Sequence, residues 1–154
     1  MIYLQRKDVD GMKKLIAFVL AVLCVVSLAG CGSKTVRFDI GEASVIHIQY
    51  RNGKDYAFMI EDDEFTRNIT ENINALRFEK TAEADGREDY VYILTWIDAK
   101  EKEMESITIT EENGYQIRYE GSYYKVANDL CIDVALINEQ IDIALSSGPA
   151  PEAE

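Results

Sequence analysis

The chain has 154 residues, and its 16 basic and 28 acidic side chains give a net charge of −12 at neutral pH. A surface this acidic repels phosphate backbones, which argues against nucleic-acid binding. The single histidine excludes a multi-histidine zinc site. About a hundred ordered residues are enough for one domain with one modest hydrophobic core.

The first feature in chain order is an apolar run, Leu15 to Val26, between Lys13-Lys14 and Leu28-Ala29-Gly30-Cys31. A basic start, an apolar middle of about 7–15 residues and small residues before a cut are typical of a secretory signal peptide. The run is shorter than the ~20 residues that a membrane-spanning helix needs. The last four residues resemble the lipobox of bacterial lipoproteins, which implies cleavage before Cys31 and a diacylglyceryl group on its sulfur.

These observations predict four segments. Residues 1–30 form a signal peptide with its true start at Met12, residues 31–34 a lipidated tether, residues 35–145 one domain, and residues 146–154 a disordered tail. Two acyl chains hold a protein stably in a membrane, so we expect the domain at the outer face of the cell membrane. Without residues 1–30 the chain keeps 12 basic and 26 acidic residues, a net charge of −14.

The cysteines leave no room for an internal disulfide in the mature chain. Cys24 belongs to the predicted leader and Cys31 would carry lipid, so Cys131 remains alone. Because Cys131 lies within an apolar helical pattern, we expect it to be buried.

The first half of the predicted domain reads as a hairpin, a helix and a strand. Val45–Tyr50 and Tyr56–Ile60 are β-type runs separated by an Asn-Gly turn. Asp62 and Asp63 can cap a helix near Glu64–Leu76, where apolar residues recur at helical spacing. Arg77–Thr81 follows as a further strand.

The second half reads as a meander and a closing helix. The predicted strands are Tyr90–Ile97, Met104–Thr110, Tyr115–Glu120 and Ser122–Val126. Asp129 can cap a helix whose apolar stripe is Leu130, Val134, Ile137, Ile141 and Leu145. The predicted fold is α+β, an antiparallel sheet of about six strands with both helices packed on one face.

In the meander, the sequence predicts the strand register of the last hairpin and leaves two registers open for the hairpin before it. If Gly114 is left-handed in a three-residue loop, Ile109 faces Ile117 and Thr108 faces Arg118. For the preceding hairpin, a three-residue loop Ala99–Glu101 would pair Val91 and Ile93 with Ile109 and Ile107. This register, which the aliphatic match favours, leaves Tyr90, Tyr92, Leu94 and Trp96 on the polar face; a loop that differs by one residue turns these side chains into the core.

The candidate binding face therefore consists of Tyr90, Tyr92 and Trp96, with Tyr123 and Tyr124 nearby. Aromatic side chains with polar tips suit recognition of sugars and proteins. A core position for them is the alternative and the more common one, because an exposed aromatic patch of this size is unusual without a partner.

Other chemistry-bearing residues favour structural interpretations. His47 alternates with Val45 and Gln49 on a solvated strand face. The acidic clusters Asp62-Asp63-Glu64 and Glu83-Asp85-Glu88-Asp89 lack the alternating ligands of a calcium loop. We predict no catalytic residues, no metal site and no cofactor.

From Val45 to Val126, five segments resemble small lipoproteins of Gram-positive bacteria that carry an α+β domain of unknown function: Ile-Gln-Tyr-Arg-Asn-Gly-Lys, Asp-Asp-Glu-Phe-Thr, Ile-Leu-Thr-Trp-Ile-Asp, Ser-Ile-Thr-Ile and Tyr-Glu-Gly-Ser-Tyr-Tyr-Lys. Lys100-Glu101 departs from the pattern, where glycine is more common. The resemblance transfers one functional position, Cys31. We expect a non-catalytic binding module for an envelope protein or cell-wall glycan; a structural or stress-related envelope accessory is the alternative, and a hydrolase is least supported.

Overall fold

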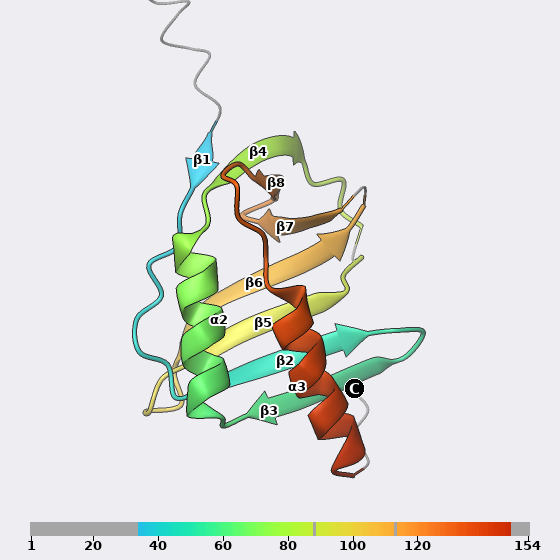
Figure 1. Ribbon diagram of the computed structural model, residues 1–154. Helices are drawn as coiled ribbons and strands as arrows, with labels where there is room; N and C mark the ends of the chain where they lie inside the picture. The colour runs from blue at the N-terminus through green and yellow to red at the C-terminus, as the bar shows by residue number, and fades with distance from the viewer. Residues whose placement is uncertain (1–33, 88, 113, 149–154) are drawn as a thin grey trace, which may run out of the picture. The chain divides into compact units, whose positions relative to one another are not determined.

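The computed structural model describes residues 34–87, 89–112 and 114–148 (Figure 1). In these residues it has eight strands and two helices: β1 (Thr35–Val36), β2 (Val45–Arg51), β3 (Asp55–Ile60), α2 (Asp63–Ala75), β4 (Phe78–Glu83), β5 (Tyr92–Ile97), β6 (Glu103–Glu111), β7 (Tyr115–Tyr119), β8 (Ser122–Val126) and α3 (Val134–Ser146). The predicted α+β class and antiparallel sheet are confirmed, but the strands number eight rather than about six. The two-residue strand β1 is too short to show alternation in a sequence.

The eight strands form one sheet in the order β1-β4-β8-β7-β6-β5-β2-β3, and every neighbouring pair is antiparallel. The hairpin β2–β3 continues the meander because β2 also pairs with β5. Figure 1 shows α2 and α3 on the same face of this sheet, as predicted.

The predicted signal peptide, the start at Met12, the tether residue Cys31 and most of the predicted tail lie outside the described residues. Within the described part of the chain, no helix is long and apolar enough to cross a membrane.

Helix α2 follows its sequence pattern closely. The Asp62 side chain accepts a hydrogen bond from the Phe65 backbone N–H at 2.7 Å, which satisfies one of the free donors of the first turn. Phe65, Ile69 and Ile73 are buried along one stripe of the helix. The helix ends where Leu76 takes an extended conformation.

Helix α3 begins one turn later than predicted. Its N-cap is Asp133, whose side chain accepts from the Leu136 N–H at 3.0 Å, so the predicted cap Asp129 is wrong. The segment before Asp133 is tied to α2, because Asn72 donates to the Cys131 carbonyl and accepts from the Asp133 N–H.

Two predictions of buried side chains in this segment are wrong. Cys131 is exposed rather than buried, and Leu130 is 53% exposed. Both residues lie in the irregular segment before the helix, where the helical spacing does not apply. Leu145 at the other end of the predicted stripe is 40% exposed.

The hairpin β6–β7 has the predicted register. Thr108 pairs with Arg118 and Ile109 with Ile117. Gly114 has a φ of 100°, which a glycine adopts without the strain that a Cβ would add.

The hairpin β5–β6 has the three-residue loop that the sequence favours. The Asp98 backbone N–H donates to the Lys102 carbonyl at 2.9 Å, which leaves Ala99–Glu101 as three loop residues. The Asp98 carboxylate also accepts from the Lys100 and Lys102 N–H groups at 2.8 and 2.9 Å. These bonds stabilise the turn although it lacks glycine, and Glu101 takes the left-handed conformation with a φ of 61°.

A β-bulge at Met104 nevertheless shifts the rest of this hairpin by one residue. Tyr92 pairs with Ile109, where the favoured register placed Val91. Because successive side chains of a strand point to opposite faces, the shift turns Tyr92 and Trp96 toward the helices. The favoured register is therefore wrong. Tyr92 and Trp96 face the core, as in the alternative, but a bulge rather than a loop of different length puts them there.

Tyr92 and Trp96 belong to the core. Trp96 is fully buried and its indole N–H donates to the Thr70 hydroxyl of α2 at 2.9 Å. Tyr92 is 2% exposed and its hydroxyl donates to the Asn138 side chain of α3 at 2.7 Å. Both helices cover these two side chains, so they hold the core positions predicted from the sequence as the more common alternative and are not part of an exposed binding face.

Candidate functional site

One face of the sheet carries neither α2 nor α3 (Figure 1). The buried side chains Ile48, Leu94 and Ile107 point toward the helices, so the residues that alternate with them point to the opposite side. We call the half-buried side chains at the centre of this side the open face: His47, Gln49, Ile93, Thr95, Ser106, Thr108 and Arg118.

The open face is arranged in two rows across the strands. His47, Thr95 and Ser106 form one row, and Gln49, Ile93, Thr108 and Arg118 form the other. The Thr95 and Ser106 hydroxyls lie 3.0 Å apart. None of these seven residues is a carboxylate, although the chain as a whole is strongly acidic.

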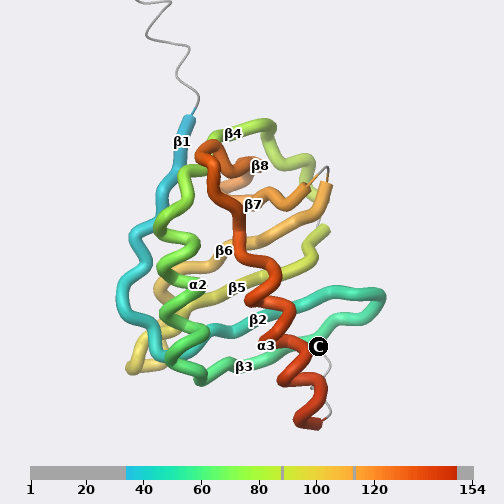
Figure 2. The backbone as a smooth tube through the Cα atoms, viewed as in Figure 1, coloured from blue at the N-terminus to red at the C-terminus, as the bar shows by residue number. Residues whose placement is uncertain are grey.

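Residues 84–87 and 89–91 form a segment that leads from β4 to β5, which we call the crossing segment. Figure 2 shows it running past the turn between β6 and β7. The Ala84 N–H donates to the Gly121 carbonyl at 2.9 Å, and the Val91 N–H to the Ile109 carbonyl at 2.9 Å. Between these ends the Arg118 guanidinium donates to the Arg87 carbonyl. The crossing segment therefore borders the open face.

Tyr90 lies in the crossing segment on the side of the open face. Its hydroxyl donates to the Asp55 carboxylate at 3.4 Å, and the Arg51 guanidinium lies 4.0 Å from its ring centroid. Of the three predicted binding residues, Tyr90 alone lies outside the core.

A pocket of about 250 Å³ lies between the crossing segment and strands β6 and β8. It is lined by Arg87, Asp89, Tyr90, Val91, Thr110, Glu111, Glu112 and Tyr123. Tyr123, which the sequence placed near the candidate face, thus shares a pocket with Tyr90. Tyr124 is fully buried on the helix side.

The tyrosines of this pocket are held in place by hydrogen bonds to carboxylates. The Tyr123 hydroxyl donates to Asp85 at 3.4 Å, as Tyr90 does to Asp55. Tyr123 is only 9% exposed. Both rings are therefore positioned before any ligand arrives.

Hydrogen bonds to arginine keep the nearby carboxylates ionised. The backbone N–H and then the guanidinium of Arg87 lower the pKa of Asp85, and the same pairing raises the pKa of Arg87, to which Glu112 adds. The guanidinium of Arg51 lowers the pKa of Asp55 in the same way. These carboxyl groups are acceptors and counter-ions at neutral pH.

A wider hollow of about 520 Å³ lies on the other side of the crossing segment. Ser106, Thr108 and Arg118 of the open face line it together with Gly86 and Gly121. It extends the polar surface toward the turn between β7 and β8.

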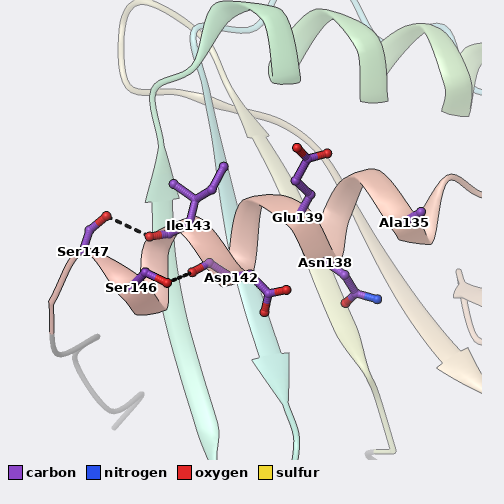
Figure 3. A pocket seen from close by; sticks show the side chains of 7 residues that line it. All are labelled: Ala135, Asn138, Glu139, Asp142, Ile143, Ser146 and Ser147. Atoms are coloured by element: carbon purple, nitrogen blue, oxygen red, sulfur yellow. Dashed lines mark hydrogen bonds between the residues drawn. The ribbon is translucent and has the colours of Figure 1, made fainter.

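The surface of α3 offers a third hollow, of about 580 Å³, shown in Figure 3. All its lining residues come from α3 and the residue that follows it. Glu139 and Ile143 point to one side of the helix and Asn138 and Asp142 to the other (Figure 3). These side chains do not converge on a common point, so this hollow is a weaker candidate.

The remaining sequence candidates have structural positions. His47 is half-buried on the open face, paired with Met59 and Thr95. Asp62 caps α2. In the described parts of the chain, no group of three or more His, Cys, Asp and Glu side chains is placed to hold a metal ion.

Sequence reasoning missed Arg87 and Thr110 as lining residues. Local patterns place Arg87 in a turn and Thr110 at a strand end, and nothing in their spacing shows that β4 and β5 lie four strands apart. The acidic, turn-rich composition of residues 83–89 was the available sign of an irregular connection.

Comparisons of the chain with protein-family models, with curated proteins and with solved structures find no match.

Proposed function

We propose that this protein is a lipid-anchored extracytoplasmic lipoprotein whose domain is a non-catalytic binding module for an envelope protein or cell-wall component. The anchor rests on the lipobox-like residues Leu28 to Cys31 and the apolar run before them. The observation that carries the binding role is the open face, a polar surface without carboxylates that neither helix covers.

The chemistry of the described side chains favours binding over hydrolysis. A hydrolase of the glycosidase type uses a carboxyl group with a raised pKa as its general acid. Hydrogen bonds from Lys80, Arg87 and Arg51 instead lower the pKa of Glu83, Asp85 and Asp55, respectively. These three groups are ionised at neutral pH and have no proton to give.

The anchor is tested by replacing Cys31 with serine in the full-length precursor. We expect the wild-type chain to incorporate labelled fatty acid and to partition with membranes. Cys31→Ser should lose the label and leave the membrane fraction, whereas Cys131→Ser should behave as wild type. An unlabelled wild-type chain would contradict the anchor.

The binding role is tested by placing a photo-reactive amino acid on each side of the domain in living cells. A probe at His47 of the open face should form an adduct of defined mass. A probe at Glu71, exposed on α2, serves as the matched control. We expect Thr108→Glu to abolish the His47 adduct, because it adds a charge beside Arg118 in the same row. Equal adducts at both positions, or none, would favour the structural accessory instead.

A further inference from the structure

The two edges of the sheet are built differently. At one edge β1 is two residues long, and the neighbouring strand β4 carries Glu79, Lys80 and Glu83 and a register shift between Lys80 and Ala82. Short strands, charges and bulges keep the edge of a sheet from pairing with another chain. At the other edge β3 has six residues with no proline, no lysine and no bulge in its ladder with β2. The edge at β3 is therefore open to a further strand.

The backbone groups on the outer side of β3 follow from the hairpin that contains it. The Arg51 N–H donates to the Val91 carbonyl at 3.0 Å, on the side of β5. Arg51 and its partner Asp55 therefore make no backbone hydrogen bonds to each other. Because this direction alternates along a strand, Asp55, Ala57 and Met59 point their N–H and C=O groups away from β2. No strand among the described residues pairs with that side.

Exposed apolar side chains gather at the same edge. Met59 on β3 is 56% exposed, and Ile143 and Leu145 in the last turns of α3 are 52% and 40% exposed. Helix α3 contacts β3, and Figure 1 shows its last turn beyond that strand. These are three of the five large apolar side chains that are exposed in the described parts of the chain. Exposed apolar surface beside an unpaired edge indicates an interface.

The charges at the two ends of β3 favour a second copy of this chain as the partner. Lys54 precedes the strand and Glu61 follows it, and both are exposed. The Asp55 carboxylate is already paired with the Arg51 guanidinium at 2.6 Å. If two β3 strands pair in antiparallel orientation, Lys54 of each copy lies near Glu61 of the other. The strand is therefore complementary in charge to a second copy of itself.

Sheet geometry selects the register of such a pair. Residues opposite one another must point their backbone groups into the new interface and their side chains to the same face. With Ala57 opposite Ala57 of the second copy, Asp55 lies opposite Met59, so all the outward-pointing residues of β3 make backbone hydrogen bonds. Tyr56 then lies opposite Phe58 on the helix side. The smallest side chain of the strand is the one that meets itself on the two-fold axis.

We propose that β3 pairs in antiparallel orientation with β3 of a second copy of this chain, across a two-fold axis at Ala57, and joins the two sheets into one. A two-fold interface uses the same surface of both copies, which this edge provides. The pair also extends the open face, because the row Gln49, Ile93, Thr108 and Arg118 continues through Ala57 into the second copy. The proposal goes beyond the proposed function and does not depend on it.

The first test is a disulfide between the two copies. The full chain with Ala57→Cys and Cys131→Ser is oxidised in non-ionic detergent. We expect a covalent dimer on a non-reducing gel, because residues paired in this way have Cα atoms about 5.5 Å apart, within the range of a disulfide. Cys131→Ser alone, and Cys131→Ser with Glu71→Cys at an exposed site on α2, are the controls and should give no dimer. No dimer from Ala57→Cys, or an equal amount from Glu71→Cys, would overturn the proposal.

Charge variants test the direction of the pair by sedimentation equilibrium in density-matched detergent. Lys54→Glu should weaken dimer formation at least fivefold, because it brings two acidic side chains together. Lys54→Glu with Glu61→Lys should restore it, because the same pair forms with its signs reversed. Ala57→Lys should abolish the dimer, because two ammonium groups would face each other on the axis, whereas Glu71→Lys should not.

The same measurement identifies the other possible occupants of the edge. A wild-type chain that stays monomeric at every concentration, or a double charge variant without recovery, would refute the pairing with a second copy. If a chain that ends at Gly148 dimerises and the full chain does not, residues 149–154 occupy the edge instead, which also refutes it.

The two proposals fail separately. A His47 adduct with twice the mass of the chain contains a second copy, whereas an adduct of another mass contains an envelope partner. Ala57→Lys should remove the dimer and leave the adduct with the envelope partner. A dimer without that adduct refutes the proposed function alone, and the adduct formed by a monomeric chain refutes the dimer alone.

Discussion

On the helix side of the sheet, replacing a side chain that is both buried and hydrogen-bonded should cost much stability. Trp96 is fully buried and bonded to Thr70 of α2. We expect Trp96→Ala to lower the free energy of unfolding by about 3–5 kcal/mol, because it leaves a large cavity. Met59→Ala, at a side chain 56% exposed on β3, should stay within about 0.5 kcal/mol. Urea unfolding checks both values, and a stable Trp96→Ala protein would place the indole outside the core.

Titration of Tyr92 should make the free energy of unfolding depend on pH in the alkaline range. Burial, and then the neighbouring Tyr115, raises the pKa of its hydroxyl from 10 to about 12. The folded state holds this proton more tightly than the unfolded state. The contribution is therefore complete below pH 10 and is lost as pH rises toward 12, by about 1.4 kcal/mol per pH unit.

Urea unfolding between pH 9 and 12 measures this loss. Tyr92→Phe removes the titrating hydroxyl and its bond to Asn138, so its stability should start lower by about 0.5–1.5 kcal/mol and fall less steeply with pH. Parallel curves for the two proteins would show that Tyr92 does not titrate in this range.

At the scale of elements, the sequence correctly predicted the features that depend on interactions between residues close together in the chain. The Asn-Gly hairpin, the Asp62 cap of α2 and the Thr108–Arg118 register follow from turn chemistry, capping and alternation, and all three are present. The start of α3 could not be read in this way. Asp129 and Asp133 are equally good caps by residue type, and contacts of Asn72 with the preceding segment decide between them.

The two candidate caps can be told apart by substitution. Asp133→Ala should cost about 0.5–2 kcal/mol, because it removes the acceptor of the Leu136 N–H. Asp129→Ala should be nearly neutral, since Asp129 is exposed and precedes the helix. Thermal unfolding of the matched pair measures the difference, and a larger loss in Asp129→Ala would restore the cap predicted from the sequence.

The bulge at Met104 could not be predicted from the sequence. It determines which aromatic side chains of β5 face the core and which residues are left for a site. The loop length was right, yet one inserted residue moved Tyr92 and Trp96 into the core. Tyr90 stayed outside because it precedes the first residue of β5, where alternation no longer applies. Of the three residues of the predicted face, only Tyr90 therefore lines a pocket outside the core.

Deleting Met104 tests whether the bulge itself is needed. Met104→Ala removes a side chain that is 38% exposed and should cost less than about 1 kcal/mol. The deletion makes Glu103 and Glu105 neighbours opposite Ile97 and Trp96, so the ladder can close without a bulge and Trp96 keeps its face. We therefore expect the deletion variant to fold, with a loss within the typical range of about 0.5–3 kcal/mol for single changes in urea unfolding. Failure of the deletion variant to fold would show that the hairpin needs the bend that the bulge provides.

For the whole molecule, the arrangement of helices on one face of the sheet and the net charge together limit which surfaces can bind a partner or a membrane. The two helices bury one face of the sheet, and among the described residues the buried core side chains run from Phe38 to Ile141. In the proposed form of the protein, the open face is left for recognition and the lipid on Cys31 for membrane attachment, because a chain that begins at Cys31 would have a net charge of −14.

This charge makes a prediction that separates lipid anchoring from electrostatic attachment. Anionic headgroups attract basic segments by about 1 kcal/mol per Lys or Arg near the surface and repel acidic ones. A chain that starts at Gly32 should therefore stay in solution with neutral vesicles and with vesicles rich in anionic lipid, at both low and physiological salt. The lipidated protein should float with both kinds of vesicle, because hydrocarbon burial of about 0.8 kcal/mol per methylene does not depend on headgroup charge or on salt. Flotation of the unlipidated chain with anionic vesicles, lost on adding salt, would reveal a basic docking surface and would contradict an anchor that depends on Cys31 alone.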